Sequence, residues 1–203
     1  MRHSMKMLLL FIVAMFGFFP LRGEIQLVTL NWKTGVCKSE CIRHLEKQLR
    51  AIPLISEIQI NEGAGQAQLK LKPNSSFTYE PFRMAMESIG ISITHLDLVV
   101  RGQISSQGQD YVLLSTGDNT AFTLINPIVP ERDNYIVQYN TVPGNKKLTP
   151  NLIKQLEEGR KAKELATIQG QLLFPENSPP LLLIIQHIKF GPPESQTKIP
   201  RSG

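Results

Sequence analysis

The chain has 203 residues, 41% of them hydrophobic, and a formal net charge of +5. The first 23 residues hold three basic side chains, Arg2, Lys6 and Arg22, and no acidic one, so residues 24–203 carry a charge of only +2. Proteins that bind nucleic acids concentrate Lys and Arg on one face. This chain shows no such stripe, and we expect no nucleic-acid partner.

The chain begins with a candidate export signal. Basic residues precede an apolar run over residues 7–19, which Pro20 ends. This is the pattern of a secretory signal peptide, and the run is shorter than the roughly 20 residues that span a bilayer. We therefore expect residues 1–23 to be a signal peptide and the protein to be extracytoplasmic, either periplasmic or secreted. A membrane is then a partner only through this segment, if it stays uncleaved.

A strand and a helix are predicted next. Residues 24–32 are apolar and rich in residues that favour strands, so they predict a β-strand. From Cys41 the apolar residues recur at helical spacing as far as Pro53, with Ser39 as the expected cap. The only two cysteines of the chain, Cys37 and Cys41, lie where the strand gives way to the helix.

A hairpin, a second helix and a further strand follow. Apolar residues alternate over residues 58–71 on both sides of glycine turn residues, which predicts a β-hairpin. A helical stripe that starts at Phe82 ends at Gly90, a natural helix stop, and residues 91–100 indicate a strand. This order of elements predicts a ferredoxin-like βαββαβ sandwich, with two helices on one face of four strands.

Part of this pattern matches a known family. After the cysteine that opens the first helix, apolar residues and a proline occur at fixed distances: Cys41, Ile42, Leu45, Leu49, Pro53, Ile55, Ile58 and Ile60. With the stretch from Met84 to Gly90, this register resembles the heavy-metal-associated domain family, the ferredoxin-like fold of copper chaperones and of metal-binding modules of P-type ATPases. The resemblance covers residues 24–100. The family usually separates its two cysteines by two residues, whereas three separate them here.

From residue 101 the pattern changes to short strands and turns. Strands are expected at residues 99–104, 111–114, 121–125 and 135–139, then a helix over residues 150–165 capped by Thr149, then strands at residues 167–174 and 181–190. This order resembles a small oligonucleotide/oligosaccharide-binding (OB) barrel. The predicted class is therefore α+β: a signal peptide (1–23), a domain similar to the heavy-metal-associated family (24–100), an OB-like barrel domain (101–190) and a flexible tail (191–203).

Metal binding is the principal functional hypothesis. A thiol in a loop and a thiol at a helix start can point at one ion, and soft thiolates select Cu(I) or Zn(II). The positive end of a helix lowers the pKa of a thiol and so favours the thiolate. The expected ligands of one ion are Cys37 and Cys41, with His44 one helical turn later as a third. The partner would be a protein metal donor or acceptor in the cell envelope.

Two alternatives remain open. In the first, Cys37 and Cys41 form a structural disulfide in a non-enzymatic module that binds another envelope protein. Cysteines four residues apart lie near the bridging distance, and an exported protein meets an oxidising compartment. In the second, the pair exchanges disulfides with other proteins. We find no other catalytic pattern and expect no enzyme. Met86, Tyr111 and Phe122 are expected to pack in cores, and His95 and His187 to be structural.

Overall fold

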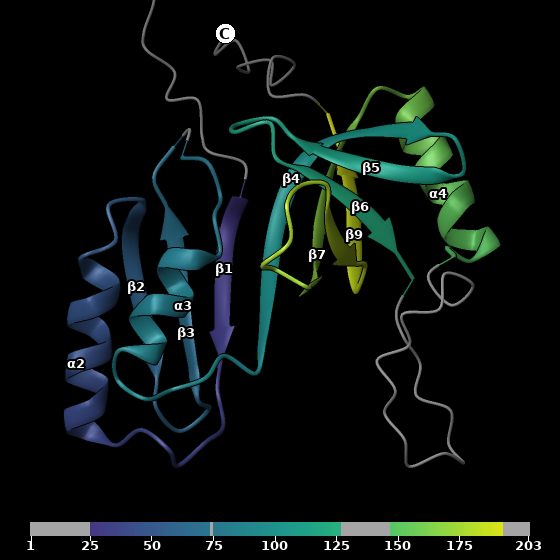
Figure 1. The fold of residues 1–203 in the computed structure, drawn as a ribbon. Helices are drawn as coiled ribbons and strands as arrows, with labels where there is room; N and C mark the ends of the chain where they lie inside the picture. Colours follow the sequence, from purple (N-terminus) through teal and green to yellow (C-terminus); the bar gives the residue numbers. More distant parts are fainter. Residues whose placement is uncertain (1–24, 74, 127–146, 193–203) are drawn as a thin grey trace, which may run out of the picture.

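The computed structural model describes residues 25–73, 75–126 and 147–192 of the chain (Figure 1). These residues form an α+β protein in which all the strands belong to one nine-stranded sheet. The predicted signal peptide, the predicted strand at residues 135–139 and most of the predicted tail lie outside the described ranges. Within those ranges, no helix is both long and apolar enough to cross a membrane.

The first half contains the elements β1 (Ile25–Asn31), α2 (Ser39–Arg50), β2 (Ile55–Asn61), β3 (Gln66–Leu71) and α3 (Glu80–Glu87), followed by β4 (His95–Gln107). This is the expected order of strands and helices. The strands lie in the order β2-β3-β1-β4, and each is antiparallel to its neighbour. The two helices contact each other and pack their apolar stripes into the core on one side of these strands (Figure 1).

Strand β4 belongs to both halves of the molecule. Over residues 96–100 it pairs with β1 along one edge and with β7 (Leu165–Leu173) along the other. The expectation of separate strands at residues 91–100 and 99–104 is therefore wrong, since one strand begins at His95 and continues to Gln107. Ile91 is buried but belongs to the connection before the strand. The predicted domain boundary at residue 100 falls inside β4.

The second half is a closed barrel of five strands. Strands β5 (Asp110–Ser115) and β6 (Ala121–Ile125) follow β4, and β8 (Leu181–Ile184) lies between β6 and β7. The circuit closes because β4 pairs with both β5 and β7. All these pairs are antiparallel except β6 with β8, which is parallel. Helix α4 (Pro150–Lys161) lies between β6 and β7 in the sequence and packs beside the barrel (Figure 1).

The expectation of one strand over residues 181–190 is also wrong. The chain leaves β8 after Ile184 and forms a separate strand, β9 (His187–Gly191), which pairs with β7 at the edge of the sheet. Two backbone hydrogen bonds hold the bend: Ile185 N donates to Ile125 O, and Gln186 N donates to Gln169 O. The continuous apolar run of residues 181–185 ends at this bend, and β9 begins with the polar His187.

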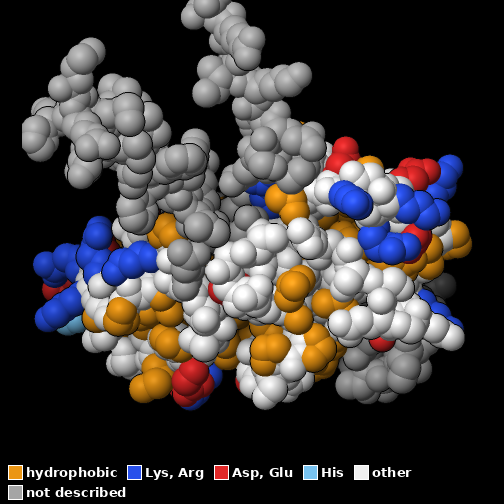
Figure 2. All heavy atoms as spheres, turned by 90° about the horizontal axis from the view of Figure 1, so that it is seen from above, with side chains coloured by type: hydrophobic (Ala, Val, Ile, Leu, Met, Phe, Trp, Pro, Cys, Tyr) orange, Lys and Arg blue, Asp and Glu red, His pale blue; other side chains and the backbone are white. Residues whose placement is uncertain are grey.

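One connected core joins the two halves. Its largest fully buried side chains come from both, with Phe82 of α3 in the first half and Phe122 of β6 in the barrel. Both Met86 and Tyr111 are also buried, as expected for packing residues. On the face seen in Figure 2, exposed hydrophobic side chains form small separate patches, and basic and acidic side chains are mixed.

Capping residues were predicted with unequal success. The prediction for Thr149 is confirmed, because its hydroxyl accepts a hydrogen bond from Leu152 N at the start of α4. The prediction for Ser39 is wrong: it is the first residue of α2, and the preceding Lys38 occupies the capping position without a side-chain hydrogen bond. The start of α2 therefore has no side-chain cap.

Candidate functional site

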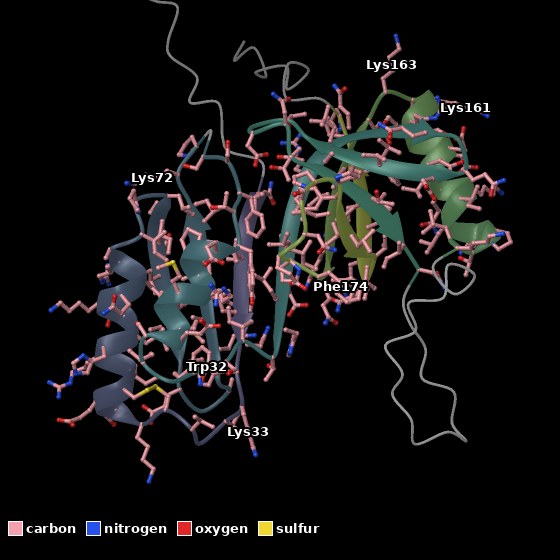
Figure 3. The ribbon with its side chains drawn as sticks, viewed as in Figure 1. Trp32, Lys33, Lys72, Lys161, Lys163 and Phe174 are labelled. Carbon is pink, nitrogen blue, oxygen red and sulfur yellow. A yellow bond between two sulfur atoms is a disulfide. The ribbon has the colours of Figure 1, made fainter. Side chains whose placement is uncertain are left out.

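The two cysteines lie together at the start of α2. Cys37 belongs to the connection from β1, and Cys41 is the third residue of the helix. Their sulfur atoms are 2.10 Å apart and their Cα atoms 5.2 Å apart, so they form a disulfide. Figure 3 shows this bond beside the lower end of α2. Cys37 is only 2% exposed, whereas Cys41 is half-buried.

Local backbone contacts bring the pair together. Trp32 N donates to Gly65 O at 2.8 Å and so fixes the end of β1 to the turn between β2 and β3. Gly35 then turns the chain with a φ of +78°, a backbone conformation that residues other than glycine rarely adopt. The helix begins when Ile42 N donates to Lys38 O. Both sulfurs therefore lie next to the positive end of the helix dipole.

His44 does not join the two sulfurs. It is exposed on α2, one helical turn beyond Cys41. Among the described residues, no group of three or more His, Cys, Asp or Glu side chains is close enough to hold a metal ion. The structure thus brings together two of the three predicted ligands and leaves the third on the surface.

A polar cluster lies on the side of the sheet away from α2 and α3. Asn31 of β1 donates to Asp97 Oδ2 on β4 at 3.0 Å, and Gln66 of β3 donates to Asn31 Oδ1 at 3.1 Å. His95 Nε2 lies 3.6 Å from the same carboxylate. Burial raises the pKa of Asp97, and the nearby His95 and the hydrogen bond from Asn31 only partly oppose it. The cluster fastens β1, β3 and β4 to one another.

Replacing Asp97 by asparagine tests this cluster. Because the pKa of Asp97 is raised in the folded state, folding favours the protonated form, and the wild type loses stability as the pH rises through that pKa. The variant keeps an acceptor for Asn31 but has no charge to bury. We expect it to gain stability relative to the wild type between acidic and neutral pH, measured by urea unfolding. A constant difference across that range would contradict the shift.

The remaining candidates found in the sequence are structural or exposed. His95 and His187 are exposed on β4 and β9. Tyr111 donates from its hydroxyl to Glu157 Oε1 at 2.9 Å, which ties strand β5 to helix α4. The hydrogen bond from Arg160, and after it the one from Tyr111, lower the pKa of Glu157. Tyr111 is therefore a packing residue whose hydroxyl is hydrogen-bonded to α4.

Two hollows on the described surface were not anticipated. One, of about 690 Å³, lies between the β4–β5 turn, β6 and α4. The other, of about 390 Å³, lies where β1, β4, β7 and β9 meet, and its walls include Arg101 and Lys189. These two basic residues are 88 positions apart in the numbering, and only the pairing of non-consecutive strands brings them together.

Comparisons with protein-family models, with curated proteins and with solved structures find no match for this chain. The class of protein is therefore defined by the fold alone: an α+β protein with a five-stranded barrel, a strand shared by its two halves, and a disulfide at the start of its first described helix.

Proposed function

We propose that this chain is an extracytoplasmic, non-enzymatic protein that holds one soft metal ion between Cys37 and Cys41 when the pair is reduced. The observation that carries the proposal is the position of the two sulfurs, which meet in the connection between the first strand and the first helix. The strand order β2-β3-β1-β4 supports a ferredoxin-like first half, in which the heavy-metal-associated family has its site at this connection. The closed strand order β4-β5-β6-β8-β7 supports an OB-type barrel in the second half.

The donor set favours Cu(I) over Zn(II). Structural zinc sites are almost always tetrahedral with four protein ligands, whereas the described residues provide no third donor beside these sulfurs. Cu(I) is soft and accepts thiolate ligands, and two sulfurs that already meet can hold it without further side chains. The bound ion would then be cargo, received from and passed to thiolates of a protein partner in the envelope.

An anaerobic titration of the reduced full-length chain with Cu(I) and Zn(II), in competition with a chelator, tests the proposal. We expect one Cu(I) per chain, weaker binding of Zn(II), and loss of the Cu(I) in the Cys37→Ser/Cys41→Ser double variant. His44→Gln is the matched control on the same helix, because His44 is exposed and apart from the sulfurs; it is expected to bind Cu(I) as the wild type does.

The burial of Cys37 supports a second function. Cys37, which is 2% exposed and already bonded to Cys41, fits a permanent disulfide that secures α2. The chain would then be an interaction module in the envelope. In that case the reduced protein binds no stoichiometric ion, and reduction lowers the free energy of unfolding by about 2 kcal/mol, the value expected for so short a loop. A thiol–disulfide exchange protein would instead show turnover with a dithiol substrate, which Cys37→Ser would abolish.

A further inference from the structure

Strand β2 forms one end of the nine-stranded sheet. The strand order places β2 and β9 at the two ends, and in the described part of the chain β2 pairs with β3 alone. An edge strand of this kind presents unpaired backbone N–H and C=O groups to a further strand. The register with β3 shifts between Ile55 and Glu57 and is then continuous to Asn61. Residues 57–61 therefore offer a regular stretch of strand for pairing.

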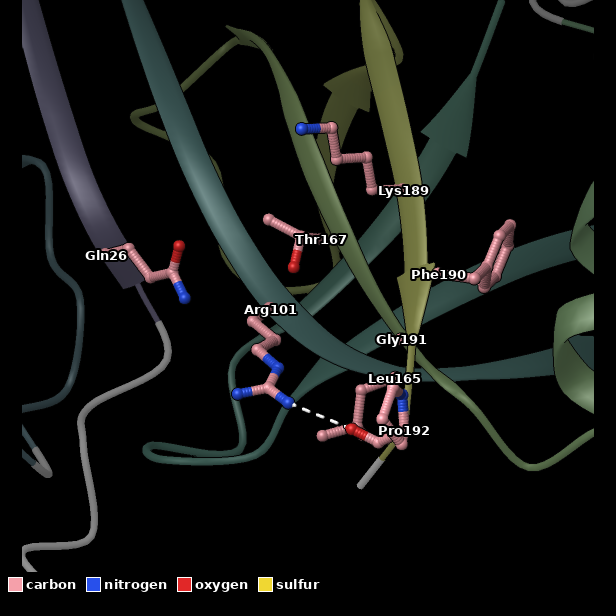
Figure 4. A pocket seen from close by; sticks show the side chains of 8 residues that line it. All are labelled: Gln26, Arg101, Leu165, Thr167, Lys189, Phe190, Gly191 and Pro192. Carbon is pink, nitrogen blue, oxygen red and sulfur yellow. Dashed lines mark hydrogen bonds between the residues drawn. The ribbon is translucent and has the colours of Figure 1, made fainter. Parts of the chain in front are cut away.

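The two ends of the sheet differ in their protection against a further strand. Proteins often guard an edge with lysine or proline. Strand β9 carries the exposed Lys189, and Pro192 follows the strand directly (Figure 4). The only ionisable side chain of β2 is Glu57, and Lys70 of the neighbouring strand neutralises it at 2.6 Å. Of the two ends, β2 is therefore the one that can accept a further strand.

The apolar core is incomplete along β2. Leu69 and Ala67 of the neighbouring strand β3 are 0% exposed. Their register partners on β2, Ile58 and Ile60, are only half-buried. Register partners share a face of the sheet, so the two isoleucines lie on the side that carries α2 and α3. A strand added beside β2, with apolar residues on that side, would remove more of their surface from water.

We propose that β2 pairs with β2 of a second copy of this chain, antiparallel and around a two-fold axis at Gln59. In this register Ile58 lies opposite Ile60 of the second copy, so apolar side chains meet on the helix side of the sheet. On the outer side Glu57 lies opposite Asn61 of the second copy, and no like charges of the two strands face each other. The stretch is thus complementary to itself, as a two-fold contact between identical surfaces requires.

The pairing keeps the disulfides of the two copies apart. Strand β2 ends at its turn to β3, where Gly65 O accepts the hydrogen bond from Trp32 N that precedes the cysteines. In an antiparallel pair these ends of the two copies lie at opposite ends of the contact. The dimer therefore needs neither the disulfide nor a metal ion, and its test is independent of the proposed function.

Sedimentation velocity of the full-length chain over a range of concentrations, with charge variants of Gln59, tests the proposal. Gln59 is exposed and would lie on the axis. Gln59→Glu and Gln59→Lys each place two like charges opposite each other and are expected to weaken the dimer roughly two- to fivefold. A mixture of the two variants pairs opposite charges and is expected to dimerise at least as tightly as the wild type, by a margin that salt reduces.

Gln103→Glu is the matched control, because it makes the same change of charge at an exposed position of β4 in the barrel. It is expected to leave the dimer unchanged. Hydrogen exchange locates the contact: amides of β2 are expected to exchange more slowly as the protein concentration rises, and amides of β9 are expected not to respond.

Three results would overturn the proposal. A chain that stays monomeric would leave an extended segment of another protein as the occupant of this edge. A dimer that Gln59→Lys alone strengthens, or that the mixture of variants does not restore, would have another register or another interface. Protection of β9 in place of β2 would move the contact to the other end of the sheet.

Discussion

Replacing Gly170 by alanine is expected to lower the free energy of unfolding by about 3 kcal/mol or more. Gly170 lies on β7 opposite Leu98, and a Cβ atom placed on it would be 1.7 Å from the backbone oxygen of Ile184. A flexible side chain could move away, but this oxygen belongs to the backbone where the chain bends between β8 and β9. Overpacking against such a neighbour costs at least as much as ordinary core overpacking. Urea unfolding measures the loss.

Gly191→Ala is the matched control for this substitution. Gly191 lies on β9, the strand that pairs with β7, and a Cβ atom there would meet nothing within 4 Å. We expect a change within about 0.5 kcal/mol. If the Gly170 variant lost no more stability than the Gly191 variant, the close approach of β7 to the bend after β8 would be contradicted.

Leu98→Ala is expected to destabilise both halves of the molecule together, by about 2–5 kcal/mol. Leu98 is 1% exposed and pairs with Val28 of β1 on one edge and with Gly170 of β7 on the other. The single tryptophan, Trp32, is buried in the first half and reports its unfolding by fluorescence. Hydrogen exchange of amides in β5 and β6 reports the barrel. Both signals are expected to shift to the same lower urea concentration.

Leu114→Ala is the matched control, because it makes the same change of side chain at an exposed position. Leu114 is on β5 of the barrel and is 39% exposed, so its truncation leaves no cavity and is expected to cost less than about 1 kcal/mol. Two separate transitions in the Leu98 variant, one from Trp32 and one from the barrel amides, would show that the halves unfold independently, as two domains divided at residue 100 would do.

The sequence predicts best those elements whose signals are local. Three elements show this: the hairpin predicted by the alternation around Gly63 and Gly65, the helix after Thr149, and the helix predicted by apolar residues three or four positions apart from Cys41 onward. Each signal lies within a short window, and the structure has each element there. The errors arise where pairing decides the outcome. Nothing in residues 95–104 shows that one strand runs through them, because the pairing with β1 and β7, far apart in the chain, makes β4 continuous there. Likewise, β8 pairs with β6 and β7 while β9 pairs with β7, and no signal within residues 181–190 names these partners.

The candidate sites divide in the same way. Cys37 and Cys41 are close in the sequence, so their spacing and the helix start suffice to bring them together. His44 also follows in sequence, but a helix turns its side chain to the surface. The hollow whose walls include Arg101 and Lys189 has no signature in the sequence, because it depends on the pairing of β4 with β7 and of β7 with β9. A signal for it exists only in the strand alternation, once the pairing is known.

The shared strand has a consequence for the order in which the chain folds. When the first half has emerged from the ribosome, β4 can pair with β1, but its other edge has no partner until β7 is made, after β5, β6 and α4. An unpaired edge is a template for wrong strand partners, and pairing over a long sequence separation is slow. The nascent first half is therefore expected to need protection from wrong strand pairing, by a chaperone or by rapid synthesis, until β7 has been made as far as residue 173.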